Sequence, residues 1–142
     1  MPFPPISACL VCEDVRQESR RLISLLGLYG IVPHVEILVM DFNQPIERLA
    51  FYLAAHGQSD GQAHRISFEL RSPAGDLVLG PIETAPVGAP PPRGTPIRLA
   101  FAFYTTGLRL PEPGVYRVVI RLDANGAEHY SGEFSVRQGA PE

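Results

Sequence analysis

Lysine and tryptophan are absent from this 142-residue sequence, and cysteine occurs only twice. The twelve basic residues are therefore all arginine, and with 15 acidic residues they leave a net charge of −3. Such a chain has no basic excess to attract phosphates, so we expect no nucleic acid among its partners. No stretch reaches the ~18 apolar residues that a spanning helix requires, so we also expect no contact with membranes.

The two cysteines, Cys9 and Cys12, have the Cys-x-x-Cys spacing of redox motifs and of half a zinc site. The run from Ile6 to Cys12 has the composition of a strand, in which positions i and i+3 point to opposite faces. We therefore expect two free thiols that share no disulfide and no metal ion. The four histidines, at positions 34, 56, 64 and 129, have no recognisable ligand spacing, and no cofactor is predicted.

The residues Met1 to Pro5 include no basic group, and no long apolar run follows them. This beginning does not have the pattern of a secretory signal peptide, so we expect a cytoplasmic location. The length is that of one domain, predicted to cover residues 1–142, with a stiff proline-rich loop at 84–94.

The clearest structural signal is the alternation of apolar and polar residues from Val115 to Val136, which predicts a β-hairpin. A three-residue loop, Ala124–Gly126, lets the apolar faces match, with Gly126 in the left-handed conformation. In this register Ile120 faces Tyr130. The same register predicts that Arg117 faces Glu133 and that His129 lies on the surface opposite Arg121.

Further strands are indicated by alternation between turn signals, and Ser72-Pro73-Ala74-Gly75-Asp76 predicts a tight turn between two of them. We expect an all-β, two-layer antiparallel sandwich of about eight strands with Greek-key connections, immunoglobulin-like or C2-like. A small barrel is the alternative. The remaining predicted strands are Ile6–Cys12, Leu22–Val32, Arg48–His56, His64–Arg71, Leu77–Ile82 and Pro96–Tyr104.

Two segments also permit a helical interpretation. Residues 13–26 place apolar side chains at helical spacing, and residues 46–56 are rich in alanine and leucine. Gly27 and Gly30 favour a strand for the first segment, and alternation favours a strand for the second.

A search for chemistry finds no catalytic constellation. No Gly-x-Ser-x-Gly turn is present, and the five aspartates at 14, 41, 60, 76 and 123 occur singly. His64 lies at the end of its predicted strand, where a half-exposed structural histidine is expected. We therefore expect a protein that is not an enzyme.

The segment Leu22–Val32 is apolar on both faces, although only one face of a sandwich strand enters the core. Its second face needs cover from the 41–45 segment, from the proline-rich loop or from another protein chain. Self-association as a symmetric dimer is the interpretation that makes this face functional. By strand parity the candidate interface consists of Ile23, Leu25, Tyr29 and Ile31.

The N-terminal third resembles a family of short, uncharacterised bacterial proteins, a domain of unknown function. The resemblance rests on the motif Cys12-Glu13-Asp14-Val15-Arg16 within Ala8–Arg16 and on the Ser24–Tyr29 strand, Ser-Leu-Leu-Gly-Leu-Tyr, within Leu22–Tyr29. A turn joins the two, and it often reads Asn-Gly-Lys in that family where this chain has Ser19-Arg20-Arg21. The resemblance implies a hairpin rather than a helix, and no activity, cofactor or catalytic residue.

We expect a non-enzymatic protein-binding or assembly module whose partner is a protein, including a second copy of itself. One alternative is a small-ligand or carbohydrate-binding module that uses exposed tyrosine and arginine. The other is an enzyme whose site is built from scattered loop residues.

Overall fold

The computed structural model describes residues 6–17, 23–84, 89–123 and 128–139, and for a few of these only the backbone. The described residues form strands joined by turns and loops, without a helix, so none of them forms a helix that could span a membrane. The nine strands are β1 (Ile6–Gln17), β2 (Ile23–Ile31), β3 (His34–Val39), β4 (Ile46–Gln58), β5 (Ile66–Arg71), β6 (Leu77–Thr84), β7 (Pro96–Leu108), β8 (Gly114–Leu122) and β9 (Glu128–Gln138).

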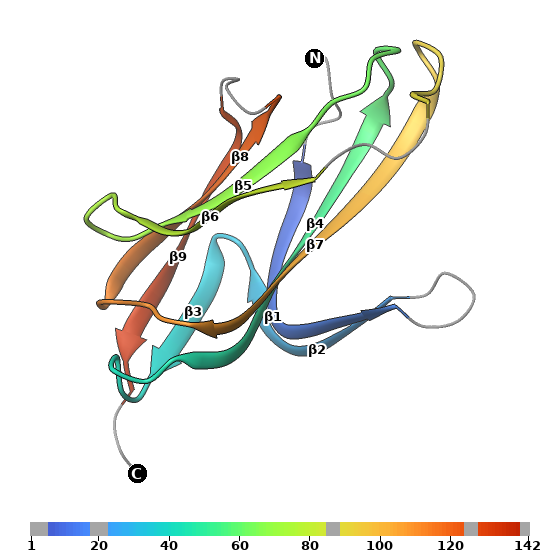
Figure 1. Ribbon diagram of the computed structural model, residues 1–142. Coiled ribbons are helices and arrows are strands. Elements are labelled where there is room, and N and C mark those ends of the chain that lie inside the picture. Colours follow the sequence, from blue (N-terminus) through green and yellow to red (C-terminus); the bar gives the residue numbers. More distant parts are fainter. Residues whose placement is uncertain (1–5, 18–22, 85–88, 124–127, 140–142) are drawn as a thin grey trace.

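The strands form one sheet in the order β6-β5-β8-β9-β3-β2-β1-β4-β7. Every pairing is antiparallel except that of β3 with β9, which is parallel. The sheet curls so that the flank β2-β1-β4-β7 lies opposite the flank β6-β5-β8-β9 (Figure 1). Among the described strands, β3 alone joins the two flanks by backbone pairing, through two residue pairs with β2 and four with β9.

The core fills the space between the two flanks. Phe51 on β4 contacts Phe68 on β5 and Phe134 on β9, with ring centroids 5.0 and 6.2 Å apart. Phe103 on β7 stacks on Phe68 at 4.6 Å. These aromatic contacts join strands far apart in the sheet order, so they hold the curl closed where no backbone ladder does.

The expectation of an all-β fold is confirmed, but the expectation of a two-layer sandwich needs correction. The flanks face each other as in a sandwich, but they are parts of one curled open sheet, a half-barrel, which is compatible with the barrel alternative. The helical interpretations are wrong, because residues 13–17 and 23–26 and residues 46–58 are strands. Strand β3 was not among the predicted strands, because the predicted strand Leu22–Val32 ends directly before Pro33 and no strand was predicted after it.

The predicted register of the β8–β9 hairpin is confirmed over most of its length. Tyr116 pairs with Phe134, Arg117 with Glu133, and Ile120 with Tyr130. The register then shifts, so that Arg121 pairs with Glu128, and the prediction that it faces His129 is wrong. The predicted loop and the left-handed Gly126 lie outside the described residues.

The turn at residues 72–76 is confirmed as well. The backbone N–H of Gly75 donates to the carbonyl of Ser72 at 2.9 Å, and Gly75 has φ +89°. Glycine takes that left-handed conformation without the steric penalty that a side chain would add.

Phe103 and Tyr104 test the closure of the curl, because they are neighbours on β7 that face opposite sides. Phe103 is buried in the core, whereas Tyr104 is 55% exposed. We expect Phe103→Ala to lower the free energy of unfolding by about 3–5 kcal/mol. Tyr104→Ala should cost less than about 1 kcal/mol. Urea denaturation measures both, and equal losses would contradict the proposed core.

Candidate functional site

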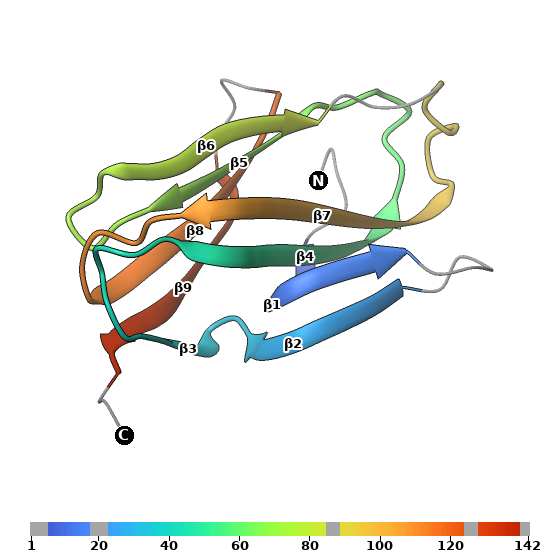
Figure 2. The same cartoon turned by 60° about the horizontal axis from the view of Figure 1, so that its bottom comes forward.

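The outer surface of β2-β1-β4-β7 carries an uncharged patch three rows deep. Cross-strand pairing defines the rows, because paired residues share a face of the sheet. The four strands lie side by side in Figure 2. We call the following eleven residues the outer apolar face: Ala8, Ala54 and Ala100; Ile31, Leu10, Tyr52 and Ala102; Leu28, Cys12, Ala50 and Tyr104.

Large side chains on this face surround a floor of small ones. Leu28, Ile31 and Tyr104 are 54%, 52% and 55% exposed, whereas Cys12 and Ala50 between them are buried. Exposed apolar area of this kind is unusual when it is contiguous rather than scattered.

In the part of the chain that the structure describes, charge lies at two borders of the outer apolar face. At one border Arg48 pairs with Thr106 across the ladder, and Asp14 lies 3.9 Å from the Arg48 guanidinium. At the other border His56 pairs with Arg98. An apolar centre with a polar rim is the usual anatomy of a protein–protein interface.

Of the four residues predicted from parity as an interface, the structure turns Tyr29 away from the outer apolar face. The register of β1 and β2 shifts between Val11 and Cys12, near Gly27 and Gly30, whose φ angles are +61° and +147°. This irregularity reverses the alternation. Of the four, Ile31 lies on the outer apolar face, Leu25 packs beside Cys12 and Val15, and Tyr29 packs against the main core. The side chain of Ile23 is outside the described part of the chain.

The irregularity adds one residue that sequence parity missed, Leu28. It pairs with Cys12 and is more exposed than Ile31. The two glycines were the available signal, because glycine within a strand pattern often marks a bulge that changes which side chains share a face.

A second cluster joins a loop to the end of β8. His64 Nε2 lies 2.7 Å from Asp60, and Nδ1 lies 2.9 Å from Asp123. His64 is half-buried as a residue, as expected, and its side chain is only 7% exposed. Asp123 also accepts from the backbone N–H of Arg65 and has φ +56°. We call these three residues the Asp-His-Asp clamp. Nothing local in the sequence indicated it, because Asp123 is 59 residues from His64.

The clamp favours a protonated imidazole. Burial alone would lower the pKa of His64, but the hydrogen bonds and charges of Asp123 and Asp60 outweigh it and raise that pKa. The pKa of Asp60 is lowered, first by the backbone N–H of Gln62 and then by His64. His64 is also the main cause of the lowered pKa of Asp123.

The two cysteines lie on opposite faces of β1, as predicted, and both are free thiols. Burial raises the pKa of Cys9 to about 12, and it also raises the pKa of the neighbouring Tyr130 to about 12. Thiols in such surroundings are weak nucleophiles. Among the described residues no group of three or more His, Cys, Asp or Glu side chains could hold a metal ion.

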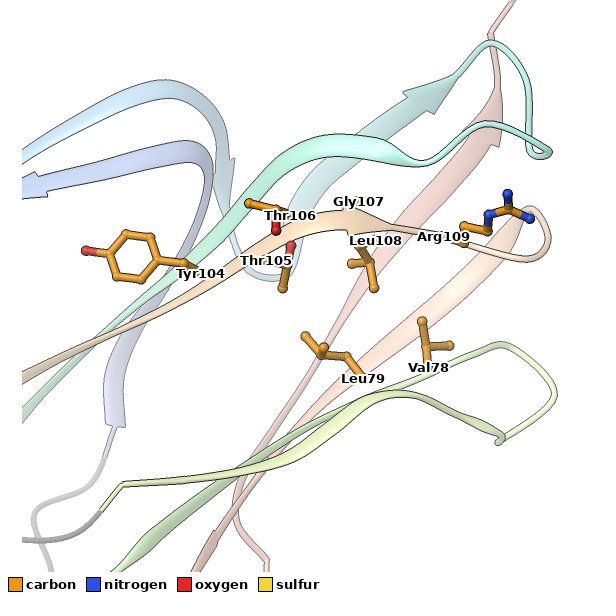
Figure 3. A pocket seen from close by; sticks show the side chains of 8 residues that line it. All are labelled: Val78, Leu79, Tyr104, Thr105, Thr106, Gly107, Leu108 and Arg109. Atoms are coloured by element: carbon orange, nitrogen blue, oxygen red, sulfur yellow. The ribbon is translucent and has the colours of Figure 1, made fainter.

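A cleft of about 480 Å³ opens where the last residues of β7 approach β6. Its walls are Val78 and Leu79 on one side and residues 104–109 on the other. Figure 3 shows Thr105 and Leu108 pointing toward Val78 and Leu79, with Arg109 at the end of the cleft.

A known protein family matches most of the chain. Residues 7–131 match the model of DUF6941, a family of unknown function. The chain belongs to that family. No curated protein matches the chain.

The clamp predicts a stability that depends on pH. Because the folded pKa of His64 is raised, its contribution is complete below the unfolded pKa and is lost as the pH rises through the folded value. The carboxyl pKa values are lowered, so their contributions are lost as the pH falls through the folded values.

We therefore expect His64→Gln to cost about 1–2 kcal/mol of unfolding free energy at pH 5.5, and less at pH 9. His56→Gln, at an exposed site on β4, is the matched control. It should change stability by less than about 0.5 kcal/mol at both pH values. Urea titrations measure both variants, and a His64→Gln penalty that is constant from pH 5.5 to 9 would contradict the charged clamp.

Proposed function

We propose that this domain is a non-enzymatic protein-binding or assembly module that self-associates through the outer apolar face. The observation that supports the proposal is the arrangement of eleven uncharged residues in three adjacent rows, with the charges of the described residues at the borders. The partner would be a second copy, packed sheet on sheet in a symmetric dimer.

The dimensions suit the centre of an interface. Four strands about 4.8 Å apart and three rows about 7 Å apart give a footprint of roughly 300–400 Å². This is the size of the largest apolar patches on soluble proteins, which are often functional. A stable interface buries about 800 Å² on each partner, so the charged border would supply the polar rim.

The shape of the face supports a second copy as the occupant. Leu28, Ile31 and Tyr104 protrude around the low positions of Cys12 and Ala50. In a dimer with a two-fold axis, the protruding side chains of each copy pack onto the low positions of the other copy. The same surface therefore forms both sides of the interface. The segments at 41–45 and 89–94 do not cover the face, because Leu28 and Ile31 are more than half exposed with these segments in place.

The test introduces charge at the face and measures the molecular mass in solution. We expect the unmodified chain to form a dimer at tens of micromolar. Leu28→Glu and Ile31→Glu should each weaken the dimer at least tenfold, about 1.4 kcal/mol, because a carboxylate would be buried against apolar groups. Sedimentation equilibrium gives the dissociation constants.

Leu38→Glu is the matched control, because Leu38 is 55% exposed on β3 and lies outside the outer apolar face. It should leave the dimer unchanged. A chain that stays monomeric at 100 micromolar, or a dimer that Leu38→Glu weakens as much as Leu28→Glu, would refute self-association through this face.

A further inference from the structure

The two ends of the sheet differ in how well they are protected against pairing with another strand. Strands β6 and β7 are the end strands, so each has one edge without a strand neighbour among the described residues. Strand β6 contains Pro81, which has no N–H, next to Gly80 with φ +91°, and its register with β5 shifts twice. Proline and bulges are the usual devices that prevent strand addition.

After its first residue, strand β7 has no proline and no register shift with β4, and its one glycine with positive φ, Gly107 at +66°, lies next to its last residue. It is 13 residues long, begins with Pro96 and includes one charged residue, Arg98, near that start. From Leu99 to Leu108 the strand is uncharged and contains no proline. A long unprotected edge of this kind invites pairing, so it either aggregates or has a partner.

The cleft lies along this edge. Six consecutive residues of the chain, 104–109, line it, although alternate residues of a strand point to opposite faces. Alternation is regular up to Gly107, where φ is +66°, so a cavity on one face would touch only alternate residues before it. Exposed Tyr104 and Thr106 and the buried Thr105 between them all touch the cleft, which places it along the main chain itself. The backbone N–H and C=O groups of the free edge of β7 therefore line the cleft.

The other lining groups indicate what could lie there. Val78, Leu79 and Leu108 offer apolar contacts, and the Thr105 hydroxyl is already donated to the carbonyl of Leu49 at 2.8 Å. Arg109 is the only charged residue in the lining, and it forms no ion pair with any carboxylate in the described ranges. A complementary occupant is extended and apolar, with an acidic group at the Arg109 end.

We propose that the edge of β7 from Tyr104 to Leu108 is a strand-acceptor site for an extended peptide segment of another protein. The segment pairs with β7 through its main chain, places apolar side chains against Val78 and Leu79, and presents a carboxylate to Arg109. About five or six residues, roughly 17–20 Å of extended chain, match this length of edge. The site is independent of self-association, which uses the face of the same strand rather than its edge.

The experiment uses the full chain and a phage-displayed library of random 12-residue peptides. We expect enrichment of peptides that alternate apolar and polar residues and carry an acidic residue near one end. The best peptide is then synthesised with one N-methylated amide at each position in turn, and binding is measured by fluorescence anisotropy. Methylation of alternate amides should weaken binding at least tenfold, because only every second amide of an added strand faces β7.

Arginine variants test the acidic end of the peptide. Arg109→Glu should weaken binding of the acidic peptide at least tenfold, and changing the peptide's acidic residue to lysine should restore it. Arg98→Glu, near the opposite end of the same strand, is the matched control and should leave binding within about twofold. Hydrogen exchange should slow at residues 104–108 when the peptide binds, and not at residues 77–84.

Four results with the unmodified chain, its Arg109→Glu variant or the peptide would overturn the proposal. They are a selection that enriches no peptide, a peptide that tolerates N-methylation at every position, binding that Arg109→Glu leaves unchanged, and exchange protection that falls outside 104–108. The monomeric Leu28→Glu chain is tested in parallel. Peptide binding to that variant alone would show that a second copy occupies the edge in the unmodified chain, which would overturn the assignment to a different protein.

Discussion

The parallel pairing of β3 with β9 is the constraint on which the architecture depends. Residues 36–39 pair with residues 135–138, and β3 joins β2 at its other end through Val35 and His34. Without this ladder the two flanks would be separate sheets, and both β9 and β3 would become edge strands in addition to β6 and β7. The N–H of Gly139 extends the contact by donating to the carbonyl of Val39 at 2.9 Å. The Arg137–Glu36 pair at 2.7 Å is exposed, so it contributes little beyond register.

This dependence explains which features could be predicted from sequence. The β8–β9 hairpin has its pairing partners close in the chain, so the alternation of Tyr116, Ile120 and Phe134 was enough to define its register. Strand β3 has its main partner about 100 residues away, and its alternation follows directly after Pro33. No local pattern shows that the buried Val35, Ile37 and Val39 face a C-terminal strand. Strand β3 was therefore not predicted, and a curled sheet was expected only as the barrel alternative.

The sequence shows that β2 has apolar side chains on both faces, but strand parity does not show which of them share a face. Parity placed Tyr29 with Ile31, and the irregularity near Gly27 and Gly30 turns Tyr29 toward the core. A single added residue reverses every later side chain in a strand. The Asp-His-Asp clamp could not be predicted from the sequence for a related reason. It depends on where two distant chain segments meet rather than on the spacing of residues along the chain.

Strand β7 has a different environment on each of its sides. Its inner side supplies Phe103 to the contact that closes the curl, and its outer side supplies Ala100, Ala102 and Tyr104 to the outer apolar face.

Its free edge lines the cleft. Packing of the core requires only the inner side of β7 to be apolar. An exposed outer side and an edge tolerate charge, and β6 shows that this chain can protect an edge with Pro81. A charge at Ala100, Tyr104 or Thr106 would leave the core intact, so packing of the core does not explain why the outer side and the edge of β7 are uncharged.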